Sequence, residues 1–275
     1  MGMNIFMSLV PVIVLFQQIH LSEAEPIIGE KVRDAKENEF SFVVSIQIKD
    51  RENSNQRKHL CTGTLVSKRH VLTAAHCLLM EKPTEELLSA YQIMIGSSDL
   101  RSGKLYNVKH WFTYNRWSLV NGKITEFLTN DIAMITLTQS VENIKPARLS
   151  KKTNEDVLGL DVQVAGWSNS KNGQIPSIMQ TAYITIMTNK ACEDAFETKR
   201  FKKPNFHKAT LCTRADPPVI IACGLSGGPL ILKGKKIIGV NTGLCFKDAN
   251  DSDQINMHVG IRYFRSFIKD IIRNY

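Results

Sequence analysis

The chain has 275 residues, 43% of them hydrophobic and 22% charged, with a formal net charge of +9. This composition excludes an intrinsically disordered chain and allows one large domain or two small ones with a substantial core. The positive charge would suit nucleic acid, anionic surfaces or acidic proteins, but no nucleic-acid-binding motif accompanies it. We therefore predict no nucleic-acid partner and interpret the charge as diffuse surface attraction. The basic cluster at residues 199–203 is interpreted as a solvated loop.

The N-terminus carries an apolar run from Ile5 to Phe16, followed by the small residues of Ser22-Glu23-Ala24. The run is too short to span a bilayer, and small residues are what signal peptidase recognises. We predict that residues 1–24 are a secretory signal peptide and that the protein is secreted and extracellular. The segment before the run lacks Lys and Arg, so an N-terminal membrane anchor is the alternative. No later segment is apolar enough to cross a membrane, and we predict no membrane partner.

Short apolar or alternating runs follow, separated by polar turns, at residues 42–46, 65–66, 92–95, 162–164, 182–186 and 236–240. Repeated short strands favour an antiparallel barrel or sandwich. The polar stretch at residues 138–156 is the natural crossing between two such units. Only the C-terminus has helical spacing, at Phe264, Phe267, Ile268, Ile271 and Ile272. We predict an all-β fold with a C-terminal α-helix at residues 264–273.

Three short strings supply a histidine, an aspartate and a serine, in that order: Thr73 to Cys77, Asn130 to Ala133 and Gly224 to Pro229. A serine hydroxyl attacks a peptide carbonyl only when a base takes its proton and an acid orients that base. Taken alone, His76 would more often be a packed core residue and Ser226 part of a turn. Their order and the apolar strands that flank them favour a catalytic triad of His76, Asp131 and Ser226.

The order of the triad resembles that of the chymotrypsin/trypsin family, whereas subtilisins and α/β-hydrolases use other orders. The resemblance covers about Ile27 to Tyr275 and includes Gly166-Trp167-Ser168, which is similar to a Gly-Trp-Gly turn of the family. It implies two antiparallel six-stranded β-barrels packed face to face, at about residues 27–140 and 141–263, with the triad in the cleft between them. It also implies hydrolysis of peptide bonds through an acyl-enzyme. The expected partners are protein or peptide substrates and protease inhibitors; a monomer and no cofactor are expected.

The six cysteines form an even set, which in a secreted chain indicates disulfides rather than thiols. Their spacing alone leaves the pairing open. A zinc site is disfavoured because no Cys-x-x-Cys pair occurs and the histidines are scattered, so we predict no metal. The resemblance to the family implies the pairs Cys61 with Cys77, Cys192 with Cys212 and Cys223 with Cys245.

The nucleophile string departs from the family pattern. Leu225 stands where the family has an aspartate that pairs with the N-terminal ammonium after activation, and two residues separate Cys223 from Ser226 where the family has three. The resemblance assigns the oxyanion hole to the backbone N–H groups of Gly224 and Ser226. A misdirected donor would lower the rate by about 10²–10³, so we expect an attenuated enzyme. The alternative is a catalytically silent homologue that acts as a binding decoy or cofactor.

The specificity pocket departs as well. The resemblance places its base at Ile221, or at Ile220 if the gap is placed differently, and its walls at Ala222, Gly243 and Asn256. Such a base offers no carboxylate to Lys or Arg, which excludes cleavage of the tryptic type. Because Asn256 should narrow the pocket, we expect a preference for modest apolar side chains.

Ile27-Ile28-Gly29 is similar to the mature N-terminus of the family, but Pro26 precedes it instead of Arg or Lys. Cleavage after Ala24 would leave a pro-dipeptide, residues 25–26, which we expect a dipeptidyl peptidase selective for Xaa-Pro to remove. A freed Ile27 ammonium would find no acid at Leu225, and burying it unpaired would cost several kcal/mol. We therefore expect that ammonium to stay in solvent or to pair with another acid.

Overall fold

The computed structural model describes most of the chain. The described residues are 27, 29, 31–50, 56–78, 83–123, 130–168, 174–197, 206–221, 223–233, 235–242 and 255–275. The predicted signal peptide and pro-dipeptide lie outside these ranges, as do Ala222, Gly243, Cys245 and the basic cluster at residues 199–203. Within the described ranges, no helix is both long and apolar enough to cross a membrane.

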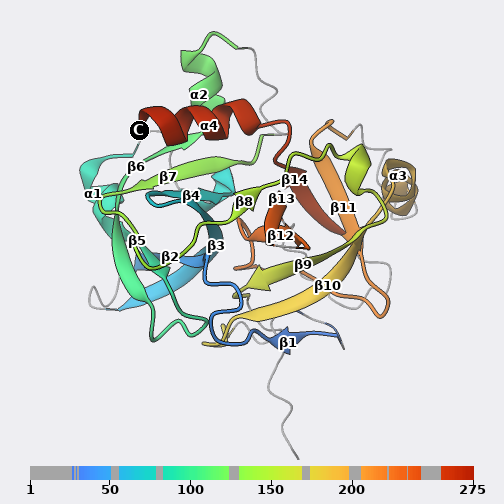
Figure 1. Cartoon of the computed structure of the whole chain (residues 1–275), viewed down its shortest axis with the longest axis horizontal. Helices are drawn as coiled ribbons and strands as arrows, with labels where there is room; N and C mark the ends of the chain where they lie inside the picture. Colours follow the sequence, from blue (N-terminus) through green and yellow to red (C-terminus); the bar gives the residue numbers. More distant parts are fainter. Residues whose placement is uncertain are drawn as a thin grey trace, which may run out of the picture.

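Six strands close the first barrel, in blue to green in Figure 1: β2 (Val43–Lys49), β3 (Arg57–Ser67), β4 (His70–Thr73), β5 (Tyr91–Ile95), β6 (Lys104–Thr113) and β7 (Ala133–Leu137). Their order around the barrel is β2-β3-β4-β7-β6-β5. β4 and β7 are buried along their whole lengths, as expected for strands with near-continuous apolar runs. His76 follows shortly after the end of β4, and Asp131 comes shortly before the start of β7.

The second barrel consists of β9 (Asp161–Gly166), β10 (Gln180–Ile186), β11 (Thr210–Arg214), β12 (Pro229–Leu232), β13 (Lys236–Asn241) and β14 (Asn256–Gly260). The order β10-β11-β14-β13-β12-β9 closes into a ring because β9 also pairs with β10. In β10, Ala182, Ile184 and Ile186 are buried while Tyr183 and Thr185 are exposed, which is the alternation that predicts a half-buried strand. The predicted all-β fold with two six-stranded antiparallel barrels is confirmed.

The N-terminal segment packs on barrel two before the chain builds barrel one. β1 (Arg33–Asp34) pairs antiparallel with β10, and Ile27 is fully buried in the apolar cluster of barrel two. Ile27 and β1 therefore pack against barrel two. The polar crossing between the barrels contains β8 (Arg148–Leu149), which lies parallel to β13.

The helices of the described chain are α1 (Glu85–Ala90), α2 (Tyr114–Val120), α3 (Asn189–Glu197) and α4 (Arg265–Asn274), with two short 3-10 turns at Ala75–Cys77 and Glu155–Val157. α4 is the predicted C-terminal helix, and Phe267, Ile268 and Ile271 form its buried face. It lies alongside α2 in Figure 1, where Trp117 Nε1 donates a hydrogen bond of 2.7 Å to Asp270. Helices as short as α1, with 6 residues, show too few turns for an apolar face to be predicted from spacing.

Candidate active site

His76 and Asp131 meet because their strands pair. β4 and β7 are antiparallel with Thr73 opposite Ala133, so the residues after Thr73 face the residues before Ala133. Asp131 holds His76 at two points: Oδ2 lies 2.6 Å from Nδ1 of the ring, and Oδ1 accepts a 2.8 Å hydrogen bond from the backbone N–H of His76. This double contact fixes the imidazole and leaves its Nε2 atom for other chemistry.

The charge state of His76 follows from the same contact. The hydrogen bond to Asp131 raises the pKa of His76 above its ordinary value, while burial acts in the opposite direction. An imidazole of raised pKa takes up a proton more readily. The geometry therefore suits a base that is oriented by a carboxylate.

Ser226 is positioned from barrel one, although it precedes β12 of barrel two. Its carbonyl oxygen accepts a 2.9 Å hydrogen bond from Thr62 N–H, and Thr62 follows Cys61. A disulfide with an S–S distance of 2.03 Å joins Cys61 to Cys77, the neighbour of His76. The hydrogen bond and the disulfide together hold Ser226 close to His76. The described residues contain no hydrogen bond between the two side chains; in enzymes without substrate, such contacts are often long and tighten on binding.

The shortened nucleophile loop is firmly held despite its missing residue. Gly224 has φ of +98° and Gly227 has φ of +81°, a region that glycine enters at little cost. A Cβ on Gly227 would lie 2.3 Å from the carbonyl oxygen of Thr62. Gly227 N–H donates to Asn241 O at 2.7 Å, and Gly228 N–H donates to Leu225 O at 3.0 Å. The N–H groups of Gly224 and Ser226 donate to no group among the described residues, so both are available as donors.

Leu225, at the position where the family has an aspartate, packs against apolar side chains instead of forming an ion pair. It is 0% exposed and lies in the same cluster as Ile27, Val164 and Leu230. The backbone N–H of Ile27 donates a 3.1 Å hydrogen bond to the side-chain oxygen of Gln180. In this chain that nitrogen is a peptide amide. Ile27 is thus buried through a neutral hydrogen bond, and the expectation for its freed ammonium, a place in solvent or a pair with another acid, stays a prediction.

His59 is a residue of the site that the sequence analysis missed. Its Nδ1 atom lies 2.8 Å from Ser45 Oγ and its Nε2 atom 3.0 Å from the carbonyl oxygen of Gly224. Burial lowers the pKa of His59 to about 4, so the ring is neutral at physiological pH. Thr62 Oγ1 donates to the same carbonyl at 2.9 Å. Two side chains of β3 therefore hold the loop that carries Ser226, and no motif in the sequence marks either of them.

Two of the four predicted pocket residues, Ile221 and Asn256, are described, and they contact each other. Asn256 Oδ1 accepts from Ile221 N–H at 2.8 Å, and Asn256 Nδ2 donates to Val219 O at 2.8 Å. Both residues are buried, with 4% of Ile221 and 5% of Asn256 exposed. The amide of Asn256 therefore bridges the backbone of Val219 and Ile221 through one hydrogen bond on each side. Ala222 and Gly243, the other two predicted wall residues, lie outside the described residues.

The remaining cysteines form disulfides, and one group of cysteine and histidine side chains resembles a metal site. Cys192 is bonded to Cys212, the pair that the family resemblance implies. Cys223 is also disulfide-bonded, but its predicted partner Cys245 lies outside the described residues. Cys61, His76 and Cys77 have possible ligand atoms within 4.8 Å of one another. Because both cysteines are in one disulfide, they offer no thiolates to a metal ion.

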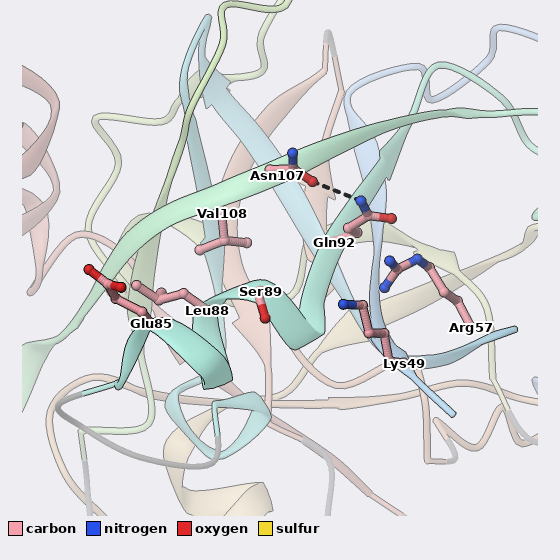
Figure 2. Close-up of a pocket in the computed structure, with 8 residues that line it drawn as sticks. All are labelled: Lys49, Arg57, Glu85, Leu88, Ser89, Gln92, Asn107 and Val108. Carbon is pink, nitrogen blue, oxygen red and sulfur yellow. Dashed lines mark hydrogen bonds between the residues drawn. The ribbon is translucent and has the colours of Figure 1, made fainter. Parts of the chain in front are cut away.

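A separate hollow lies on barrel one, lined by β2, β3, α1, β5 and β6 (Figure 2). It measures about 410 Å³ and contains Lys49, Arg57 and Glu85, so both signs of charge are present. Gln92 and Asn107 in its wall form a 2.7 Å hydrogen bond with each other. None of the three predicted triad residues lines it, and it presents no nucleophile held by a base.

Comparison with known proteins identifies the family to which the chain belongs. The family model for trypsin matches residues 30–268. Granzyme M of Rattus norvegicus is 26% identical over 87% of this chain and 87% of its own length, and chymotrypsin-2 of Vespa crabro is 26% identical over 76% and 86%. The structure of neuropsin, a serine protease expressed in the limbic system of mouse brain, is similar with a TM-score of 0.69 and 19% identity over 88% of this chain and 99% of that one. This chain belongs to the trypsin family of chymotrypsin-like serine proteases.

Proposed function

We propose that this protein is a secreted serine endopeptidase that hydrolyses peptide bonds through an acyl-enzyme. Ser226 is the nucleophile, His76 the general base and Asp131 the residue that orients His76. The observation that carries the proposal is the two-point contact between Asp131 and His76, at 2.8 Å and 2.6 Å. The nucleophile loop beside it has two N–H groups without an acceptor among the described residues. Secretion rests on the predicted signal peptide at residues 1–24.

The mechanism follows from these positions. His76 Nε2 takes the proton of Ser226 Oγ as the oxygen attacks the substrate carbonyl, and the resulting imidazolium is stabilised by the Asp131 carboxylate. The N–H groups of Gly224 and Ser226 receive the developing oxyanion. His76 then gives its proton to the leaving amine, and water repeats the sequence on the acyl-enzyme. Neither N–H group has an acceptor among the described residues. A lowered catalytic rate would therefore come from N–H groups that point away from the oxyanion, and not from N–H groups that are already bonded elsewhere.

The first test is covalent labelling of the nucleophile. A fluorophosphonate should modify the secreted protein at one site, because only an activated serine reacts with such a reagent at a useful rate. Intact mass and peptide mapping should place the adduct on Ser226, and Ser226→Ala should abolish it. A folded protein that remains unlabelled would instead be the catalytically silent homologue.

The substrate preference is the second test. We propose that the protein cuts after modest apolar residues and not after Lys or Arg, because the described pocket residues Ile221 and Asn256 offer a cation no carboxylate, and the Asn256 amide is already bonded to the backbone. A peptide library should show cleavage after Leu, Val, Met or Ala and background cleavage after Lys and Arg. Asn256→Gly should raise kcat/KM for substrates with a bulky aromatic residue before the scissile bond about tenfold, compared with substrates that have alanine there. Tryptic preference in the parent protein would refute the assignment of the pocket.

We also propose that removal of residues 25–26 is not needed for the nucleophile loop to form. Ile27 is buried through a neutral hydrogen bond to Gln180, and Leu225 requires no ammonium. N-terminal sequencing of the secreted protein will establish whether Glu25 and Pro26 are removed, as the sequence predicts.

A further inference from the structure

Two short stretches carry many of the exposed positive charges. Residues 145–152 and residues 233–236 contain no acidic side chain. We call their cationic residues the basic surface; all seven are exposed, and they are Lys145, Arg148, Lys151, Lys152, Lys233, Lys235 and Lys236. In the sequence, the stretches are separated by most of barrel two.

The fold brings the two stretches side by side. β8 pairs in parallel with β13 and sets Arg148 opposite Lys236, and Ser150 N–H donates to Ile237 O at 2.8 Å. Figure 1 shows β8 next to β13 near the middle of the molecule. Like charges on paired strands repel each other. This arrangement therefore lowers the stability of the free protein and favours a partner that brings negative charge.

A hollow of about 170 Å³ lies within the basic surface. Its lining includes Lys145, Arg148 and Lys235, the hydroxyl-bearing Ser41, and the apolar Phe42 and Pro146, and no carboxylate. Ammonium, guanidinium and hydroxyl groups are the donors that bind sulfate and phosphate oxygens. The hollow has the size and the donors for one such group.

Three lysines of the basic surface are not neutralised by another described residue. Lys145, Lys235 and Lys236 form no ion pair with another described residue. Glu142, the acid that precedes this stretch, is already bonded to Lys68 at 2.6 Å. Two of these unpaired lysines, Lys145 and Lys235, line the hollow.

We propose that the basic surface binds a sulfated polysaccharide, with one sulfate group in the hollow and its neighbours along the two stretches. Sulfates are fully ionised and repeat along the chain, which matches a strip of cations better than a single anion does. An acidic polypeptide usually needs an apolar anchor in addition to charge, and this hollow is small, with Phe42 and Ala147 of its lining themselves buried. Single-stranded nucleic acid would need aromatic platforms for its bases, whereas Phe42 here is buried.

The test is binding of the secreted protein to immobilised heparin. The parent protein should bind and be released by salt, because exposed charges are screened. The triple variant Lys145→Glu, Lys235→Glu, Lys236→Glu should bind about tenfold or more weakly, since three attractions become repulsions. A control with the same change in net charge is Lys104→Glu, Lys109→Glu, Lys269→Glu, at exposed lysines outside the surface; it should retain most of the binding. Circular dichroism establishes that each variant is folded.

Three outcomes would overturn the proposal. The parent protein could fail to bind heparin, or the control variant could lose as much affinity as the basic-surface variant, which would indicate diffuse attraction by net charge. Tighter binding to poly-L-glutamate than to heparin would assign the surface to an acidic protein. None of these measurements requires catalytic activity, so they stand apart from the labelling of Ser226.

Discussion

Replacement of Asp131 by asparagine should lower kcat by about 10⁴ while leaving the fold intact. The carboxylate accepts from His76 at both Nδ1 and the backbone N–H. An asparagine amide can present an N–H to the ring instead, which drives the ring proton onto Nε2. The lone pair of the ring is then on Nδ1, and Nε2 cannot take the proton of Ser226. The measurement is the hydrolysis of a peptide chosen from the library, together with the rate of fluorophosphonate labelling.

The pH dependence of the same variant gives an independent check. Asp131 raises the pKa of His76, so the parent protein loses its base as the pH falls below that raised value. Without the charge, the pKa of His76 should fall, and the acid limb of the residual kcat/KM profile should move to lower pH. The control is Asp99→Asn, which removes a partly exposed carboxylate paired with Arg101 and should leave both rate and profile unchanged. Equal losses in the two variants would contradict the assigned role of Asp131.

The second large effect is expected at Leu225. In the chain that retains residues 25–26, Leu225→Asp should lower the free energy of unfolding by about 3–5 kcal/mol, because it buries a carboxylate with no cation beside it. Leu225 is 0% exposed in an apolar cluster that also contains Ile27, whose nitrogen is a peptide amide bonded to Gln180. Urea unfolding followed by tryptophan fluorescence measures the change.

Starting the same variant at Ile27 should recover much of that loss. A free ammonium at Ile27 would then lie in the cluster that contains the new carboxylate, and the pair would replace two buried unpaired charges. Leu225→Asn, which is polar but uncharged, is the matched control and should show no comparable gain when the chain starts at Ile27. If Leu225→Asp destabilises both forms equally, the Ile27 nitrogen is not the neighbour that the packing indicates.

Those parts of the molecule that rest on local patterns could be predicted from the sequence. The alternation in β10 and the apolar runs of β4 and β7 gave the strands, and the spacing of Phe267, Ile268 and Ile271 gave α4. The family resemblance supplied the two-barrel closure, which no strand reveals by itself. These features depend on residues close together in the chain or on a motif shared with relatives.

Contacts between distant segments could not be predicted. His59 holds Gly224 across a separation of 165 residues, and Gln180 receives the N–H of Ile27 across 153. Single polar residues of this kind look like any other surface side chain until the fold buries them. The basic surface is similar: its two stretches become neighbours only through the parallel pairing of β8 with β13.

The contacts of β3 with the nucleophile loop make the reaction sensitive to how the two barrels are joined. His59 and Thr62 of barrel one bind the carbonyl oxygens of Gly224 and Ser226, yet the loop itself is part of barrel two by sequence. A slide or rotation of one barrel against the other would be transmitted to Ser226 before either core was disturbed. Substitutions along that seam can therefore change turnover while the melting temperature stays constant, and barrel two produced alone would lack the template that shapes its own loop.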